Sequence, residues 1–244
     1  MPSASLRGTV TNDSLSAVLD HVRKSAWPAD MIAMTGDLIQ DDSPDAYARF
    51  RSHFENFDIP VHCIPGNHDI REYMRAALSS APFHYCDSYS RRNWLIVGLD
   101  SCKTNSAGGH VAPDEIRRLH DIVDGGNAEH VLICLHHPPL AMGSRWLDGV
   151  GLDDGAGFLN ALERIGKVRG CLFGHVHQAF DTVHKAMRII GTPSTCRQFL
   201  PGSDEFALDD QPPAYRRVEL NDDGSIASEL IWVPMRSQPG ETSQ

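Results

Sequence analysis

The chain has 244 residues and a formal net charge of −10, from 22 Lys and Arg against 32 Asp and Glu. This length suits one domain that buries a hydrophobic core without disulfide or metal staples. The negative net charge argues against a protein that binds nucleic acid or an anionic membrane through a basic surface. Since no leader-like segment follows Met1 and no run of about 18 apolar residues occurs, we expect a cytoplasmic protein.

Histidine is the residue type that stands out in the composition. The chain has 13 histidines, and histidine is both the commonest metal ligand and the usual acid or base near neutral pH. The six cysteines form no Cys-x-x-Cys pair. We therefore expect buried thiols in a reducing compartment rather than a zinc knuckle or a disulfide framework.

Helical patterns and short apolar runs alternate through most of the chain. The spacing of apolar residues predicts helices over 12–25, after Pro44, after Pro113 and before Gly166. Strands are predicted over 31–34, 61–64, 94–99, 131–135 and 170–173. Three more strands, with a hairpin turn at 221–224, follow without intervening helices: 187–190, 215–220 and 226–233. We expect a single domain over residues 1–235 and a polar tail over 236–244.

Four of the predicted strands end in polar side chains suited to metal chemistry. In chain order they lead into Thr35-Gly36-Asp37, Pro65-Gly66-Asn67-His68-Asp69, His136-His137-Pro138-Pro139 and Gly174-His175-Val176-His177. Ligands of open α/β sheets bind beyond the carboxyl ends of the strands, so we expect these side chains to meet at one edge. Carboxylate and amide oxygens combined with imidazole nitrogens suit Mn, Fe or Zn. Their joint occurrence predicts a metal site.

In these four motifs and their order, the sequence resembles the calcineurin-like metallophosphoesterases over nearly the whole chain. Segments 192–196 and 201–204 are similar to the branch of bacterial 3′,5′-cyclic AMP phosphodiesterases. The resemblance implies an α/β fold, with two mixed β-sheets packed as a sandwich flanked by helices (αββα). It also implies hydrolysis of 3′,5′-cyclic nucleotides such as cAMP by a metal-bound hydroxide. The cofactor would be two divalent ions, Fe/Mn or Mn/Mn, with Zn as a further option.

The resemblance also assigns roles to individual residues. The metal ligands would be Asp37, which bridges the two ions, Asn67, His136, His175 and His177. His68 would be the catalytic group that faces the phosphate, with Asp69 as its orienting partner. Asn67 and His68 would bind substrate, and His137 would either bind substrate or shape the strand end. Because a metal pair attracts a phosphodiester anion locally, an acidic protein can still bind this substrate.

One part of the family pattern is missing. The family opens with a strand that ends in Asp-x-His, two ligands of the first metal, and no such motif follows an apolar strand near Met1. Asp37 and His177 alone then remain for that metal, while the other keeps four ligands. We expect an N-terminally truncated reading frame. Asp13 and His21 are alternative ligands, which their place on a predicted helix disfavours.

Several features leave alternatives open. His110 is a candidate to contact substrate from a loop at the same edge. Residues 143–157 would form a lid or a plain solvated loop, and the long irregular segment 199–213 would serve substrate selection or a dimer contact. The alternative functions are hydrolysis of glycerophosphodiesters or other small phosphoesters, and a non-catalytic scaffold with an incomplete metal site. We expect a small phosphodiester as partner, no nucleic acid polymer and no membrane, and leave a homodimer open.

Overall fold

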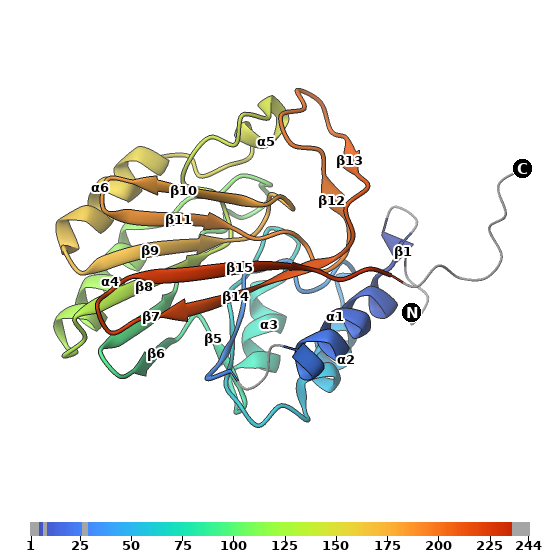
Figure 1. Ribbon diagram of the computed structural model, residues 1–244, viewed down its shortest axis with the longest axis horizontal. Helices are drawn as coiled ribbons and strands as arrows, with labels where there is room; N and C mark the ends of the chain where they lie inside the picture. The colour runs from blue at the N-terminus through green and yellow to red at the C-terminus, as the bar shows by residue number, and fades with distance from the viewer. Residues whose placement is uncertain (1–4, 7–8, 26–28, 236–244) are drawn as a thin grey trace, which may run out of the picture.

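The computed structural model describes residues 5–6, 9–25 and 29–235. Its main layer is a six-stranded mixed sheet in the order β10-β11-β9-β8-β7-β6 (Figure 1). The strands are β6 (Ser88–Arg91), β7 (Trp94–Gly98), β8 (His130–Leu135), β9 (Val168–Phe173), β10 (Phe180–His184) and β11 (Met187–Gly191). Strands β7, β8, β9 and β11 run parallel, and the edge strands β6 and β10 are antiparallel to their neighbours. Every residue of β7 and β8 is buried, as expected for parallel strands covered on both faces.

The second layer has two separate parts that lie against the inner face of the main sheet. One is a parallel three-stranded sheet of β3 (Ile32–Met34), β4 (Val61–Cys63) and β5 (Phe83–Tyr85). The other is the antiparallel hairpin β14 (Ala214–Leu220) and β15 (Ile226–Trp232), which crosses in front of the main sheet (Figure 1). Ile96, Leu132 and Leu172 of the main sheet form the core between the layers, together with Val218 and Ile226.

Helices cover the two outer faces. The three-stranded sheet is covered by α1 (Thr11–Ser25), α2 (Pro44–Phe54) and α3 (Arg71–Leu78). The outer face of the main sheet is covered by α4 (Pro113–Asp124) and α6 (Gly155–Ile165). The short elements are α5 (Arg145–Asp148) and the strand pairs β1 (Ser5–Leu6) with β2 (Thr9–Val10) and β12 (Gln198–Phe199) with β13 (Leu208–Asp209). None of the helices in the described part combines the length and apolarity needed to span a membrane.

The predicted layers are confirmed, with one difference in the second sheet. The expected helices and strands form within a few residues of their predicted bounds, and all six cysteines are free. The second layer is interrupted rather than continuous, because β3 pairs only with β4 and β14 pairs only with β15 in the described residues. Helix α3 and strands β5, β6 and β10 were not predicted. The expected tail over 236–244 lies outside the described residues.

A stacked histidine pair in the three-stranded sheet makes the fold sensitive to acid. The rings of His62 in β4 and His84 in β5 lie 4.6 Å apart and nearly parallel, and the buried Nε2 of His62 has no hydrogen-bond partner among the described residues. Burial, with a contribution from repulsion by His84, lowers the pKa of His62 to about 4. In the unfolded chain His62 takes up a proton below a pKa of about 6.5, whereas in the folded protein it stays neutral down to about 4. The free energy of unfolding therefore decreases as the pH falls from about 6.5 to about 4.

We expect His62→Phe to reduce this acid sensitivity, because a phenyl ring can stack on His84 but has no nitrogen that is protonated in the unfolded chain. Between pH 7.5 and pH 4.5 the variant should lose about 2–3 kcal/mol less unfolding free energy than the wild type. Urea unfolding in the presence of a chelator measures this difference. Replacing the exposed His110 by Phe is the control. If the wild type and His62→Phe lose the same unfolding free energy between pH 7.5 and pH 4.5, the histidine pair is not the source of the acid sensitivity.

Candidate metal centre

Four side chains from separate strand ends converge at one edge of the two layers. Asp37 follows β3, Asn67 follows β4, His136 follows β8 and His175 follows β9. The Oδ1 of Asn67 lies 3.2 Å from Nε2 of His136 and 3.0 Å from Nδ1 of His175. The two ring nitrogens are 3.1 Å apart, and Nε2 of His136 is 3.3 Å from Oδ2 of Asp37. Two oxygen and two nitrogen donors therefore share one small volume, as the strand-end pattern predicts.

The backbone at the strand ends is bent to aim these donors. Gly36 has a φ of 93° and Asp37 a φ of 55°, both in the left-handed region that glycine and short polar residues tolerate best. His175 and His177 also have positive φ values, 66° and 47°. This conformation costs free energy for a histidine, and it is typical of residues whose direction is fixed by a site.

Charge pairing stabilises the Asp37 and His136 side chains. Burial alone would raise the pKa of Asp37, but the nearby His136 and His68 hold this pKa well below its usual range. Burial opposes protonation of His136, yet the Asp37 carboxylate raises the pKa of His136 overall. The Nδ1 of His136 donates to the carbonyl of Thr35 at 2.7 Å. This bond leaves Nε2, the nitrogen that faces the other donors, as the ligand atom of a neutral ring.

The donor set fits a divalent transition metal. Metal bonds of about 2.0–2.2 Å place neighbouring ligand atoms roughly 3–3.5 Å apart, which matches the separations of the four donors. The other nitrogen of His175, Nε2, is buried without a hydrogen-bond partner among the described residues. Burial and the neighbouring His136 lower the pKa of His175 well below its usual value. A buried imidazole that is neutral and turned towards oxygen donors is a ready metal ligand.

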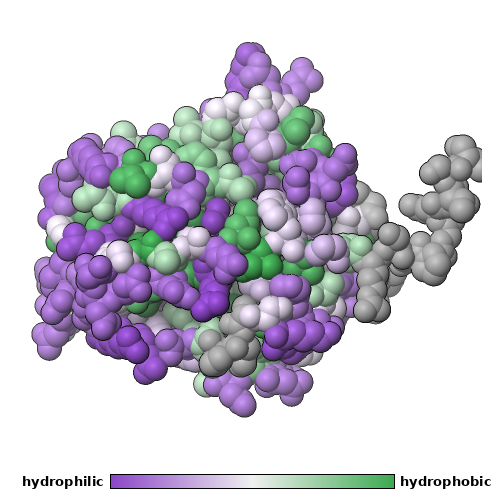
Figure 2. All heavy atoms as spheres, in the orientation of Figure 1, coloured by the Kyte–Doolittle hydropathy of each residue, from purple (hydrophilic) through white to green (hydrophobic). Residues whose placement is uncertain are grey.

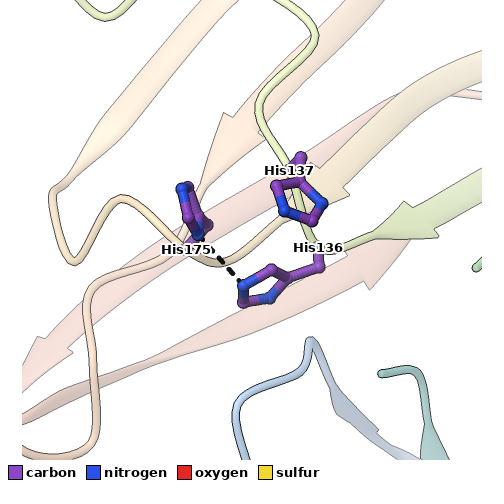
Figure 3. Close-up of side chains that lie close together, drawn as sticks. All are labelled: His136, His137 and His175. Carbon is purple, nitrogen blue, oxygen red and sulfur yellow. Dashed lines mark hydrogen bonds between the residues drawn. The ribbon is translucent and has the colours of Figure 1, made fainter. Parts of the chain in front are cut away.

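His137 lies beside these ligands but is bonded elsewhere. A nitrogen of His137 lies within 4.8 Å of one from His136 and one from His175, and Figure 3 shows the three rings side by side. Its Nδ1, however, lies 2.8 Å from Oγ of Ser101 and its Nε2 lies 3.2 Å from the carbonyl of Ala107. The ring is fully buried. The His137 ring therefore connects the end of β8 to Ser101 and to the loop that contains Ala107.

His177, the expected ligand of the second metal, lines the same cavity as Asp37, His136 and His175. Its Nδ1 donates to the carbonyl of Arg197 at 2.8 Å, which leaves Nε2 as the nitrogen with a lone pair. Burial is the main reason that the pKa of His177 falls to about 4. Asp37 and His177 are the two expected ligands of that metal. His21 is instead bonded to Tyr215 at 3.1 Å, and Asp13 is exposed on α1.

His68 and Asp69 occupy different surroundings from those expected. His68 is exposed, its backbone N–H donates to Oδ1 of Asp37 at 2.9 Å, and its Nδ1 lies 3.3 Å from Nε2 of Gln40. The Asp69 carboxylate accepts from the backbone N–H groups of Gly66 and Leu38 and from the Tyr47 hydroxyl. Asp69 therefore connects the loops after β3 and β4, and the His68 ring has Gln40 as a hydrogen-bond partner.

The remaining loop candidates lie beside the site. The backbone N–H of His110 donates to the carbonyl of Ser101, and the His110 side chain is exposed. Segment 143–157 contains α5 and the start of α6, and backbone hydrogen bonds attach it to Gly109 and Pro138. Sequence reasoning missed Thr35, Gln40, Tyr47 and Ser101 as partners of site residues. Of these four residues, only Thr35 could have been found from the sequence, because it directly precedes Gly36-Asp37 at the end of a predicted strand.

An apolar groove runs from this centre along the gap in the second layer. The cavity has a volume of about 370 Å³ and lies between β3 and β14, with α1 and the inner face of the main sheet completing its walls. Asp37, His136, His175 and His177 line it as well. All three residues of β3 are partly or fully exposed, whereas all three of β4 are buried. Figure 2 shows hydrophobic atoms between hydrophilic ones on this face.

Comparison with known proteins places this centre in a family. Residues 10–179 match the family model described as Calcineurin-like phosphoesterase. The chain is 35% identical over 230 residues to the 3′,5′-cyclic adenosine monophosphate phosphodiesterase CpdA of Pseudomonas aeruginosa, which covers 94% of this chain and 84% of that protein. It is 34% identical over 241 residues to the enzyme of the same name from Escherichia coli K12, which covers 98% of this chain and 88% of that protein.

Among solved structures, a dimetal phosphatase from Danio rerio superposes with a TM-score of 0.60 at 16% identity, over 93% of this chain and 90% of that one. The protein described as TT1561 of Thermus thermophilus gives a TM-score of 0.57 at 16% identity, over 89% of this chain and 92% of that one. At such identities these likenesses show the fold alone. The four motifs, their convergence at one edge and the match over residues 10–179 together show that the chain belongs to the calcineurin-like phosphoesterase family.

Proposed function

We propose that this protein is a metal-dependent phosphodiesterase that hydrolyses 3′,5′-cyclic nucleotides, cAMP among them. The observation that carries the proposal is the convergence of Asp37, Asn67, His136 and His175 within 3.0–3.3 Å contacts. The 35% identity to a curated cAMP phosphodiesterase favours this substrate over other small phosphoesters. In the complete centre Asp37, Asn67, His136 and His175 would hold one divalent ion, and Asp37 and His177 would contribute to holding a second; the ions would be Fe/Mn or Mn/Mn, with Zn as an option.

Each side chain has a defined task in this proposal. Divalent ions supply Lewis acidity and lower the pKa of bound water, which gives a nucleophile at neutral pH. Asp37 provides negative charge that holds cations, and Thr35 fixes the tautomer of His136. His68 stands at the exposed rim with Nδ1 towards Gln40, so its Nε2 is the nitrogen that can donate a proton to the O3′ leaving group as the P–O3′ bond breaks.

We expect His68→Asn to lower kcat for cAMP by about 10²–10⁴-fold, the usual contribution of a general acid. Metal content should stay at the wild-type level, because the hydrogen bond from His68 to Asp37 is made by the backbone N–H, which the substitution retains. The assay is formation of 5′-AMP by Mn²⁺-loaded protein, with metal analysis of the same samples and His120→Asn, on α4, as the control. An unchanged kcat would remove His68 from the mechanism. Protein that binds two metal ions but yields no 5′-AMP would contradict the proposed substrate.

We further infer that the centre is complete when an extended strand fills the apolar groove. The edges of β3 and β14 that face the cavity have no strand partner there among the described residues, and Asp37 and His177 are part of the cavity lining. We propose as the occupant an extended apolar segment that carries a carboxylate and an imidazole at its end, the donor types that would join Asp37 and His177 at the second metal.

A further inference from the structure

The segment 197–199, at the start of β12, runs alongside His177. The carbonyl of Arg197 accepts from Nδ1 of His177 at 2.8 Å, and the backbone N–H of Phe199 donates to the carbonyl of His177 at 3.1 Å. The Phe199 ring stacks on the His177 ring, with centroids 4.2 Å apart and planes 5° from parallel. The segment is therefore held directly against an expected ligand of the second metal.

The side chain of Gln198 indicates which way its two neighbours point. It is buried and bonded back towards its own loop. Its Oε1 accepts from the Ser194 N–H at 2.9 Å, and its Nε2 donates to the carbonyls of Ser194 at 2.8 Å and Pro212 at 3.0 Å. Side chains alternate between the two faces of an extended chain. Arg197 and Phe199 therefore lie on the face opposite to Gln198, the face from which Phe199 stacks on the expected ligand.

The Arg197 side chain has no partner among the described residues. Its Nε is buried without a hydrogen-bond partner, and its guanidinium forms no ion pair or ring contact within the described part of the chain. Of the arginines in that part, Arg164, which is exposed on α6, is the other one without such a contact. A guanidinium is always charged and carries five N–H donors. Burying one of these donors unpaired costs free energy, which a bound anion would recover.

The loop that carries Arg197 is fixed by its own hydrogen bonds. The N–H of Ala214 donates to the Ser194 carbonyl at 3.0 Å, and the N–H of Cys196 donates to Oγ of Ser194 at 3.0 Å. Together with the bonds of Gln198, these contacts hold the backbone at Arg197 in place without a ligand. Less conformational entropy is then lost when the guanidinium binds an anion.

We propose that Arg197 binds the nonbridging phosphate oxygens of the substrate, next to His177. This inference rests on the proposed function, because it names a substrate-binding residue of that same site. The planar guanidinium matches two phosphate oxygens with two parallel N–H donors. Because the protein as a whole has a net charge of −10, a local cation at the centre offsets the repulsion of an anionic substrate.

The test compares two ligands that share the base and the sugar and differ in the phosphate. Calorimetric titration of Mn²⁺-loaded protein with 5′-AMP and with adenosine measures both affinities. We expect Arg197→Gln to weaken 5′-AMP binding about tenfold, as for the loss of a hydrogen bond to a charged group. Adenosine affinity and Mn²⁺ content should not change. Arg197→Lys keeps the charge but not the planar fork and should recover part of the affinity. Arg164→Gln, which removes the other arginine without a partner, is the control.

The outcomes separate this inference from the proposed function. Selective weakening of 5′-AMP binding in Arg197→Gln supports the phosphate contact even if protein with two bound ions does not hydrolyse cAMP, a result that would overturn only the proposed function. Unchanged 5′-AMP affinity, equal weakening of both ligands or no 5′-AMP binding by the Mn²⁺-loaded wild type would overturn the contact. A loss of bound Mn²⁺ in both Arg197 variants would also overturn it, and would assign Arg197 to holding His177 in position.

Discussion

Replacing Asp37 by Asn should lower the affinity of the centre for Mn²⁺ by more than about 100-fold. This loss exceeds the ~10–100-fold that follows when a residue that only hydrogen-bonds to a metal ligand is replaced. Asp37 is the carboxylate in the four-donor cluster, and its Oδ2 lies 3.3 Å from Nε2 of His136. Asparagine keeps the shape and tolerates the positive φ at this position, so the change removes charge and one anionic ligand atom with little effect on the loop. Turnover of cAMP should fall at least as far as the metal affinity.

Calorimetric Mn²⁺ titration and 5′-AMP formation measure the two effects on the same protein. The matched control is Asp153→Asn, because Asp153 is an exposed carboxylate paired with Lys103 at 2.8 Å. The control should bind Mn²⁺ like the wild type. Wild-type Mn²⁺ affinity in Asp37→Asn would show that the metal lies elsewhere.

Replacing Gly66 by Ala should damage both the fold and the centre. An added Cβ would lie 2.1 Å from Oδ1 of Asp37 and 2.3 Å from the Asp37 backbone nitrogen, distances that no side chain can occupy. The loops after β3 and β4 must then separate, which breaks the bond of 2.9 Å from the Gly66 N–H to Asp69. We expect a loss of about 2–3 kcal/mol of unfolding free energy, as for an overpacked site, and at least a 100-fold loss of Mn²⁺ affinity.

Urea unfolding with a chelator and Mn²⁺ titration separate these two losses. Gly126→Ala is the control, because its Cβ would meet its nearest neighbours, the carbonyls of Ile122 and Val123, at 3.5 Å and 4.0 Å. It should leave both quantities near the wild-type values. If Gly66→Ala also keeps them, the close approach of the two loops is not needed for the centre.

The convergence of four donor side chains could be predicted because the pattern that carries them is local. Asp37, Asn67, His136 and His175 each follow an apolar run that the sequence marks as a strand, and parallel strands bring their carboxyl ends to one edge. The side chains that orient these ligands are not marked in this way. Tyr47 reads as part of the apolar stripe of α2, yet its hydroxyl donates to Asp69 across 22 positions of sequence.

Features formed by segments that are far apart in the sequence could not be predicted from local sequence patterns. The groove exists because β3 and β14 face each other without pairing, a relation between residues about 180 positions apart. Trp146 of α5 packs against Phe199 and Phe206 of the β12–β13 region. The segment 199–213 could be singled out only by its length and irregularity, and no pattern predicted that Phe199 at its start stacks on His177.

The most direct test of the metallophosphodiesterase proposal is hydrolysis of cAMP by two versions of the protein whose bound metal is counted. One is this chain, and the other carries an N-terminal extension with an apolar strand that ends in Asp-x-His. The account predicts that the extended protein binds two divalent ions, fills the groove between β3 and β14, and converts cAMP to 5′-AMP with Mn²⁺. An extended protein that binds two ions yet cleaves neither cAMP nor another phosphoester would contradict it.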